Sequence, residues 1–149
     1  MSTPAADLPK ADHILVEKAK RTLSLMRGGK VLKTYQVALG PNPVGPKEKE
    51  GDGKTPEGVY RIDWRNPQSQ YHLSLHISYP DEKDVTRAKK QGVSPGGDIM
   101  IHGLPNGMGA LGAAHRLTNW TVGCIAVTNE EIQEIWNAVP DGTSIEIRP

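Results

Sequence analysis

The residue with the clearest chemical potential is Cys124, the single cysteine of the 149-residue chain. It directly follows Gly123, in an apolar stretch just before a predicted helix. A glycine lets the backbone turn so that successive N–H groups point at one spot. Such a turn can present a nucleophilic thiol next to an oxyanion hole of backbone N–H groups. The spacing alone leaves a second interpretation open, an inert cysteine packed as a small hydrophobic residue.

His102 is the candidate base for this thiol, because a thiol nucleophile needs a lowered pKa or a neighbouring base. It ends the apolar run Ile99–His102, a predicted strand, and strand ends and their loops often carry catalytic groups. The next residue is Gly103, so no adjacent side chain can orient the imidazole. We expect a backbone carbonyl to fix its tautomer. An ordinary strand histidine is the alternative, since a Cys/His pair without a motif is a weak signal.

Other candidate sites are weaker. His72 and His76 have the spacing of metal ligands on a helix, but the alternating residues around them predict a strand. Their rings would then lie about 13 Å apart, too far for one zinc ion. No metal site and no cofactor is predicted. A thiol redox protein is disfavoured because no second cysteine exists to resolve an oxidised thiol.

The composition indicates one turn-rich, mainly β domain, with 16 Gly and 12 Pro in 149 residues. A formal net charge of +1 argues against a nucleic-acid partner. No apolar run approaches the roughly 18 residues of a transmembrane segment. The first residues lack the basic and apolar regions of a signal peptide. The basic clusters Lys18–Arg21 and Arg87–Lys90 are interpreted as solvated faces.

Strands are predicted where apolar residues alternate or run together. Gly28 and Gly29 predict a hairpin between the second and third strands. Residues 1–12 are expected to be a loose tail and Gly40–Thr55 a long loop. The predicted strands are His13–Ala19, Thr22–Met26, Val31–Leu39, Gly58–Asp63, Tyr71–Ser78, Ile99–His102 and Thr143–Arg148, with a short apolar segment at Gly123–Val127.

Two helices are predicted. The first spans Asp81–Gln91, with acidic residues in its first turn, lysines in its last and a glycine after it. The second begins at Thr128, which forms a capping-box pattern with Glu131. Apolar residues then recur at the spacing of one helix face. A further helical turn is expected near Ala110–Ala114.

Taken together, these motifs resemble one known family. The pair His102-Gly103, followed by Thr121-x-Gly123-Cys124, resembles the His-Gly … Ser/Thr-x-Gly-Cys signature of the L,D-transpeptidase catalytic domains. Several separated motifs in the same order make the resemblance specific. Further segments similar to the family are Glu50–Tyr60, Asn66-Pro67, Tyr71–Leu75 and Pro95–Ile99.

The resemblance implies a catalytic domain over residues 13–149, a mixed β-sandwich or barrel-like sheet with one or two short helices. It implies a transferase that acts on peptidoglycan stem peptides in the periplasm or cell envelope, in cell-wall biogenesis and cell shape. Cys124 would attack the carbonyl of a stem-peptide diamino acid, expel the terminal D-alanine and form a thioester. An amine from a neighbouring stem, or from an envelope protein, would then take the acyl group.

Residue by residue, the resemblance assigns the nucleophile to Cys124, the general base and acid to His102, and a backbone place in the oxyanion hole to Gly123. Arg116 is a candidate for binding a substrate carboxylate, although a surface loop residue is the alternative. The remaining substrate-binding candidates are Trp120, Thr121 and Tyr71, and for Trp120 the alternative is a core residue.

Two positions depart from the family pattern. Val122 stands where many members have a second histidine, and Ala126 stands where many have Arg or Asn. A pocket reshaped in this way could favour water as the acceptor. A thiol hydrolase of the same linkages, an amidase or carboxypeptidase, is therefore the alternative function. The third hypothesis is a non-catalytic cell-wall-binding module in which Cys124 is merely packed.

Overall fold

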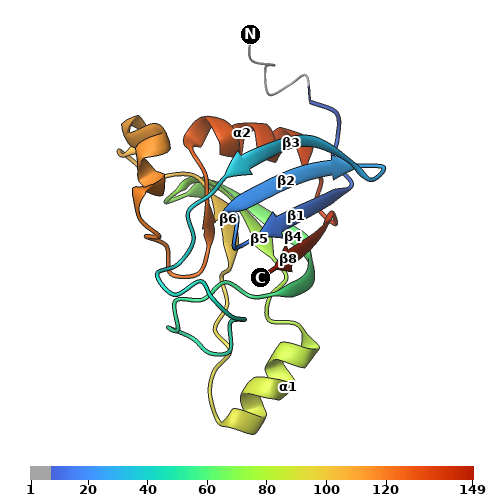
Figure 1. Cartoon of the computed structure of the whole chain (residues 1–149), viewed down its shortest axis with the longest axis vertical. Helices are drawn as coiled ribbons and strands as arrows, with labels where there is room; N and C mark the ends of the chain where they lie inside the picture. Colours follow the sequence, from blue (N-terminus) through green and yellow to red (C-terminus); the bar gives the residue numbers. More distant parts are fainter. Residues whose placement is uncertain (1–7) are drawn as a thin grey trace.

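The computed structural model describes residues 8–149, and these residues form a mixed sheet of eight strands with helices outside it (Figure 1). The strands are β1 (His13–Glu17), β2 (Thr22–Arg27), β3 (Lys30–Gln36), β4 (Gly58–Ser69), β5 (His72–Ile77), β6 (Met100–His102), β7 (Ile125–Ala126) and β8 (Ser144–Arg148). The helices are α1 (Glu82–Gln91), the 3-10 helix η2 (Gly109–Leu117) and α2 (Asn129–Ala138).

The strands follow the order β3-β2-β1-β8-β4-β5-β6-β7. The pairs β1/β8 and β6/β7 are parallel and the other neighbours are antiparallel. The long strand β4 pairs with β8 through its first part and with β5 through its second. Ala38, which follows β3, exchanges two hydrogen bonds with Ala126 of β7, at 3.0 and 2.9 Å. The two ends of the strand order therefore meet, and the sheet closes in the barrel-like manner that the sequence predicted.

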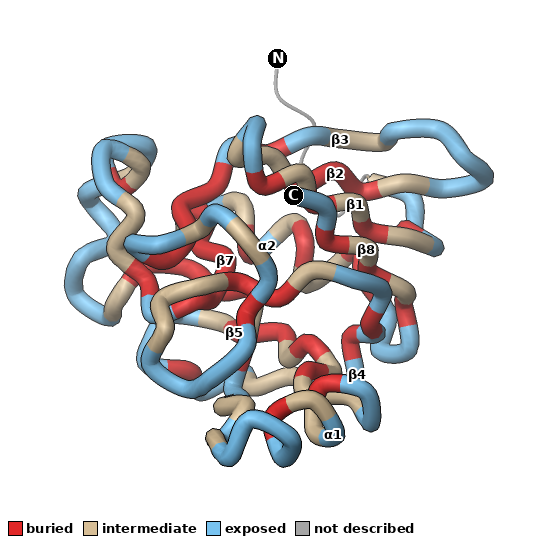
Figure 2. The backbone as a smooth tube through the Cα atoms, turned by 60° about the horizontal axis from the view of Figure 1, so that its bottom comes forward, coloured by how far each residue is buried: buried red, intermediate tan, exposed pale blue. Residues whose placement is uncertain are grey.

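The interior of this closed sheet is filled by the aliphatic residues that alternate along the strands. Figure 2 shows the buried positions along the backbone in red. Helix α2 packs against β5 and β6 and adds Ile132 and Ile135 to the same core. Full burial of each such side chain contributes about 1.5–3 kcal/mol relative to exposure. The fully buried strand residues include Ile14, Val16, Leu23, Leu25, Ile62, Leu75, Ile77, Ile101, Ile125 and Ile145.

Turn and capping residues act where the sequence predicted them. Gly28 and Gly29 have φ values of 57° and 78°, as the tight turn between β2 and β3 requires. Asp81 caps α1, and Gly92 ends it in the left-handed conformation. Thr128 caps α2 through the expected capping box. Both predicted helices are confirmed, and the expected helical turn near residues 110–114 lies inside η2.

Lys18 is not part of a solvated face, which corrects the interpretation from sequence. Its side chain is 2% exposed and its Nζ lies 3.0 Å from a carboxylate oxygen of Glu57. The same Nζ donates hydrogen bonds of 2.8 Å to the carbonyls of Gly45 and Thr55. Burial lowers the pKa of Lys18, while the Glu57 carboxylate opposes this change. The lysine ties the long loop after β3 to the sheet.

Strand β4 continues to Ser69 rather than ending near Asp63 as predicted. Pro67 has no N–H to give to a neighbouring strand, which made a strand through it improbable from sequence. In the structure the register of β4 and β5 shifts between Asn66 and Ser69. This irregularity accommodates the proline, and the extension supplies one wall of the site described below.

The prediction of a loose tail covers residues 1–12, of which residues 1–7 lie outside the described residues. Ala11 is buried and its N–H donates to the carbonyl of Ala138 at 2.8 Å. Asp12 donates its N–H to Met26 at 2.9 Å. These two residues already belong to the folded domain. Among residues 8–149, no helix has both the length and the apolar character needed to cross a membrane.

Candidate active site

The two predicted catalytic residues lie on one face of the sheet, near the junction of β6 and β7. These strands are parallel, with Ile101 opposite Ile125 and His102 opposite Ala126. Side chains alternate between the two faces of a strand. This register therefore places His102 on the same face as Cys124, the residue just before β7.

Both side chains open into a cleft of about 350 Å³. The cleft also contains Tyr71, Trp120 and Thr121, so the structure brings together most of the predicted site residues. Its other lining residues, which the sequence did not single out, are Trp64, Asn66, Ser69, Gln70, Ser74, Asp98, Met100 and Val122.

The imidazole of His102 is held in one tautomer. Its Nδ1–H donates to the carbonyl of Gly103 at 2.7 Å, which confirms the expected backbone partner. The Nε2 lone pair is therefore the one that can accept a proton. Burial lowers the pKa of His102 to about 4, against the opposing effect of the Gly103 carbonyl. The ring is thus neutral at pH 7, the form that a general base requires.

Two aromatic rings surround this imidazole. The ring of Tyr71 stacks on His102 with centroids 4.3 Å apart and 24° between the planes. The indole of Trp120 lies 5.7 Å from the imidazole and donates its N–H to His115 at 3.2 Å. Trp120 therefore lines the cleft, while its indole N–H has His115 as hydrogen-bond acceptor. These rings shield the base from water and account for its depressed pKa.

Gly103 is required for this arrangement. A Cβ at this position would lie 2.6 Å from Oδ1 of Asn129 and 3.0 Å from the carbonyl of Tyr71. The Gly103 N–H donates to that same Tyr71 carbonyl at 2.9 Å. The glycine after His102 therefore lets the Tyr71 backbone come close enough for its ring to stack on the base.

The thiol of Cys124 donates to the carbonyl of Asp98 at 3.3 Å, and the residue is 7% exposed. Burial raises the pKa of this thiol, although the backbone N–H of Met100 opposes the increase. The resting cysteine is therefore protonated at neutral pH. Its proton has to leave during the attack on a substrate, which makes a neighbouring base necessary rather than optional.

The turn before the cysteine is shaped by Gly123, whose φ is 122°. A Cβ there would lie 2.7 Å from the carbonyl of Lys54. The hydroxyl of Thr121 accepts from the Gly123 N–H at 3.2 Å and donates to the Cys124 carbonyl at 2.8 Å. Thr121 thus holds the turn through its hydroxyl, which engages the Gly123 N–H and leaves the N–H of Cys124 outside this contact.

The long loop after β3 supports this turn from below. The buried hydroxyl of Thr55 donates to the Gly123 carbonyl at 2.8 Å. A Cβ on Gly40 would lie 2.3 Å from the carbonyl of Gly53 and 3.0 Å from the Gly123 nitrogen. The glycines of the loop therefore permit three backbone segments to pack directly against one another at the nucleophile.

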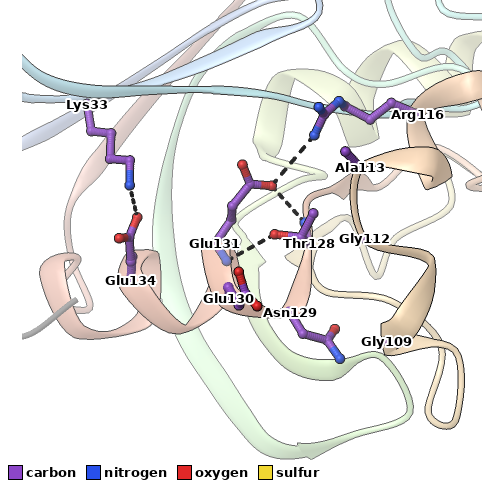
Figure 3. Close-up of a pocket in the computed structure, with 10 residues that line it drawn as sticks. All are labelled: Lys33, Gly109, Gly112, Ala113, Arg116, Thr128, Asn129, Glu130, Glu131 and Glu134. Carbon is purple, nitrogen blue, oxygen red and sulfur yellow. Dashed lines mark hydrogen bonds and ion pairs between the residues drawn. The ribbon is translucent and has the colours of Figure 1, made fainter. Parts of the chain in front are cut away.

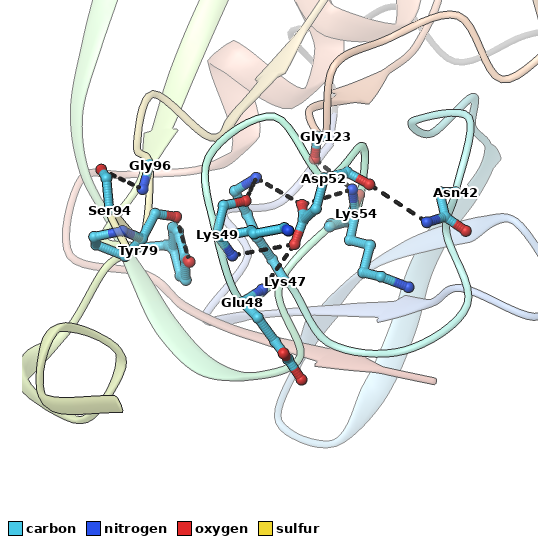
Figure 4. A network of polar contacts seen from close by, with 12 residues as sticks. Asn42, Lys47, Glu48, Lys49, Asp52, Lys54, Tyr79, Ser94, Gly96 and Gly123 are labelled. Atoms are coloured by element: carbon cyan, nitrogen blue, oxygen red, sulfur yellow. Dashed lines mark hydrogen bonds and ion pairs between the residues drawn. The ribbon is translucent and has the colours of Figure 1, made fainter. Parts of the chain in front are cut away.

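Asp52 organises this loop (Figure 4). Its carboxylate accepts backbone N–H groups of Glu48, Lys49 and Lys54 at 2.9–3.1 Å and pairs with the buried Nζ of Lys47 at 3.0 Å. Burial acts to raise the pKa of Asp52, but these hydrogen bonds hold it below its usual value. The charged residues Lys47, Glu48 and Lys49 are thus held in fixed positions around Asp52.

We expect Thr55→Val to impair both stability and activity. The variant keeps the volume but leaves the Gly123 carbonyl without its donor, which costs about 1–3 kcal/mol of the free energy of unfolding. The matched control is Thr143→Val, which removes a comparable hydrogen bond to the Pro140 carbonyl, at a residue that does not line the cleft. Thermal unfolding should shift in both variants, whereas cysteine acylation should slow only in Thr55→Val. Equal acylation rates in the two variants would show that the hydrogen bond from Thr55 to Gly123 does not support the position of Cys124.

Arg116 is not brought to the cleft. It lines a separate pocket of about 440 Å³ beside the start of α2 (Figure 3). Its guanidinium lies 4.0 Å from a carboxylate oxygen of Glu131, and Lys33 pairs with Glu134 in the same pocket. The guanidinium thus faces a carboxylate of the protein, outside the cleft that Cys124 and His102 line.

The histidines of β5 do not form a metal site. His72 and His76 lie on a strand, as the alternation predicted. His76 instead pairs with Asp63, Nδ1 to Oδ1, at 2.6 Å. The part of the chain that the structure describes contains no group of three or more His, Cys, Asp or Glu residues placed to hold a metal ion.

Comparisons with known proteins point in one direction. The model of the YkuD family, described as the L,D-transpeptidase catalytic domain, matches residues 11–147. A relative in Escherichia coli K12, YafK, provisionally named an L,D-transpeptidase, is 31% identical over 134 residues, which is 85% of this chain and 46% of the relative.

Solved structures agree with this. The helical cell shape determining protein Pgp2 of Campylobacter jejuni (K307A mutant) matches with a TM-score of 0.68 and 26% identity, covering 95% of this chain and 48% of that one. L,D-transpeptidase 1 of Mycobacterium tuberculosis matches with a TM-score of 0.56 and 17% identity, covering 92% and 60%. The second likeness concerns the fold alone. The chain spans about half the length of YafK and Pgp2.

Proposed function

Since the chain belongs to the L,D-transpeptidase catalytic domain family, we propose that it is a cysteine-dependent acyltransferase acting on peptidoglycan stem peptides. The observation that carries the proposal is the opening of Cys124 and a neutral His102 into one cleft. A protonated thiol and an unprotonated imidazole on the same sheet face are the two halves of a nucleophile and its base. A merely packed cysteine would need neither the shared cleft nor the oriented base.

The proposed reaction begins when Nε2 of His102 takes the thiol proton as Sγ attacks the carbonyl of the stem-peptide diamino acid. The oxyanion that forms is stabilised by the N–H groups of Gly123 and Cys124, of which the Gly123 N–H contacts the Thr121 hydroxyl at 3.2 Å in the free site. Collapse of this intermediate breaks the peptide bond, and the departing D-alanine amine takes the proton from His102. The product is a thioester on Cys124 and free D-alanine.

In the second half-reaction an acceptor amine attacks the thioester and gives a proton to His102. The carbon–sulfur bond breaks, and the sulfur recovers its proton from the imidazolium. We propose an amine of a neighbouring stem peptide, or of an envelope protein, as acceptor. Peptidoglycan lies outside the cytoplasmic membrane, so the proposed location is the periplasm or cell envelope.

Hydrolysis of the same linkages is the second candidate, and the size of the cleft favours it. About 350 Å³ lies at the low end for ligand pockets. It suits part of one stem, and a second stem would have to bind largely outside it. A water molecule as the acceptor needs no additional space in the cleft. In this version of the reaction a water molecule, deprotonated by His102, attacks the thioester and releases a shortened stem peptide.

The test is product analysis with a purified tetrapeptide stem, with and without an excess of an amine-bearing acceptor stem. We expect D-alanine release in both reactions, because both candidate functions share the first half-reaction. A joined peptide that appears only with the acceptor identifies a transferase, and a tripeptide in both reactions identifies a hydrolase. Absence of D-alanine release, or release that persists in Cys124→Ala, would contradict both and support a non-catalytic wall-binding module.

A further inference from the structure

Trp64 is an exposed aromatic residue in the cleft that the proposed reaction does not use. It lies on β4 and is 44% exposed. Its ring stacks on the imidazole of His76, with centroids 4.7 Å apart and 15° between the planes. The His76 Nδ1–H donates to a carboxylate oxygen of Asp63 at 2.6 Å. The indole is therefore packed on a fixed support through one face and remains accessible to a ligand.

A β-bulge gives Trp64 this position. The register of β4 and β5 shifts between Ile62, which lies opposite Ile77, and Trp64, which lies opposite His76. Asp63 and Trp64 consequently both reach His76, one as hydrogen-bond acceptor and the other as stacking partner. Bulges recur next to active sites, where they redirect a side chain. Because the ring is already held, little conformational entropy is lost when a ligand binds to it.

The sheet register also gives the distance from Trp64 to the thiol. Trp64 pairs with His76, and His76 pairs with Met100. Met100 lies beside Cys124 in the parallel register of β6 and β7. Three strand spacings amount to about 14 Å. In peptidoglycan the diamino acid is the third residue from the sugar, and three extended residues cover about 10 Å. The lactyl linkage that joins the peptide to the sugar adds about 4 Å, so the sugar end of a stem bound at Cys124 would reach Trp64.

We propose that Trp64 is a stacking platform for the sugar ring that carries the stem peptide bound at Cys124. This inference rests on the proposed function. The apolar C–H face of a hexose packs on an aromatic ring, while amide side chains beside the ring bind hydroxyl and acetamido groups. Asn66 is such a side chain, because it lines the same cleft. Its Oδ1 accepts from the Gln68 N–H at 2.9 Å, which leaves its Nδ2 hydrogens for a ligand.

The experiment compares two substrates with the same tetrapeptide, one carrying the GlcNAc–MurNAc disaccharide and one without it. The readout is the ratio of their kcat/KM values. We expect wild type to prefer the glycosylated substrate and Trp64→Ala to lower this ratio about fivefold, mainly through KM. Trp64→Phe should restore most of the preference. The control is Val59→Ala, which truncates an exposed residue at the other end of the same strand and should leave the ratio unchanged.

A wild-type ratio of one or less, or a ratio that Trp64→Ala leaves unchanged, overturns the inference. If wild type turns over neither substrate, the proposed function has failed and the platform is tested by binding alone. The GlcNAc–MurNAc disaccharide is then titrated into Cys124→Ala and followed by chemical shifts of the indole N–H groups. Shifts at Trp64 that vanish in the double variant with Trp64→Ala support the platform, and absence of shifts at Trp64 rejects it.

Discussion

Replacing Cys124 by alanine is expected to abolish covalent labelling by a carbapenem, which acylates nucleophiles through its strained ring carbonyl. Loss of a catalytic nucleophile reduces turnover by about 10⁴-fold or more. Wild type should gain the mass of one intact carbapenem in intact-protein mass spectrometry, and Cys124→Ala should gain none. The substitution removes one sulfur whose contacts are hydrogen bonds with the backbone of Asp98 and Met100, so the fold should survive it.

The control for this experiment is Thr143→Val, which alters a buried side chain that does not line the cleft and keeps the thiol. Its labelling rate should match that of wild type. A carbapenem adduct that persists on Cys124→Ala would mean that another residue is the nucleophile. A wild-type protein that remains unlabelled while circular dichroism shows it to be folded would favour the non-catalytic module.

Replacing His102 by glutamine is expected to slow acylation at pH 7 by about 10²- to 10⁴-fold. Glutamine retains a donor for the Gly103 carbonyl but cannot take the thiol proton. The raised pKa of Cys124 makes this loss large, because few thiolates exist at neutral pH without the base. Stopped-flow acylation by a carbapenem measures the effect directly.

The pH dependence separates this catalytic role from a structural one. The pKa of His102 is about 4, so its protonation should end wild-type acylation only when the pH falls toward 4. At higher pH, through neutrality, the acylation rate of the wild type should change little. In His102→Gln the rate should instead follow the thiolate fraction and rise about tenfold per pH unit up to the pKa of Cys124. Two profiles of the same shape would exclude His102 as the base.

Local signals in the sequence predicted most of the elements. The Gly28-Gly29 turn, the caps at Asp81 and Thr128 and the apolar alternation of the strands each act within a few residues of where they stand. The family resemblance also assigned the nucleophile to Cys124 and the base to His102. The structure adds that one register puts them on the same sheet face.

What could not be predicted depends on contacts between distant segments. The burial of Lys18 follows from three oxygen partners that belong to a loop some 30 residues further along the chain. The continuation of β4 past Pro67 requires a bulge that only the partner strand β5 defines. The position of Trp64 in the cleft likewise depends on a bulge against β5, between Ile62 and Trp64. Arg116 is near the nucleophile in sequence, yet it faces Glu131 in another pocket, because η2 carries it away from the cleft.

The hydrogen bonds between Ala38 and Ala126 have a consequence for how the protein would lose its proposed activity. A two-residue strand such as β7 would fray easily if it were held from one side. Here the Ala126 N–H donates to Ala38 at 2.9 Å, and the Val127 N–H donates to His102 at 3.0 Å. Cys124 and His102 therefore lie beside the hydrogen bonds that close the whole barrel. Heating should not yield a partly melted, inactive intermediate, because the two groups separate only when the entire domain unfolds cooperatively.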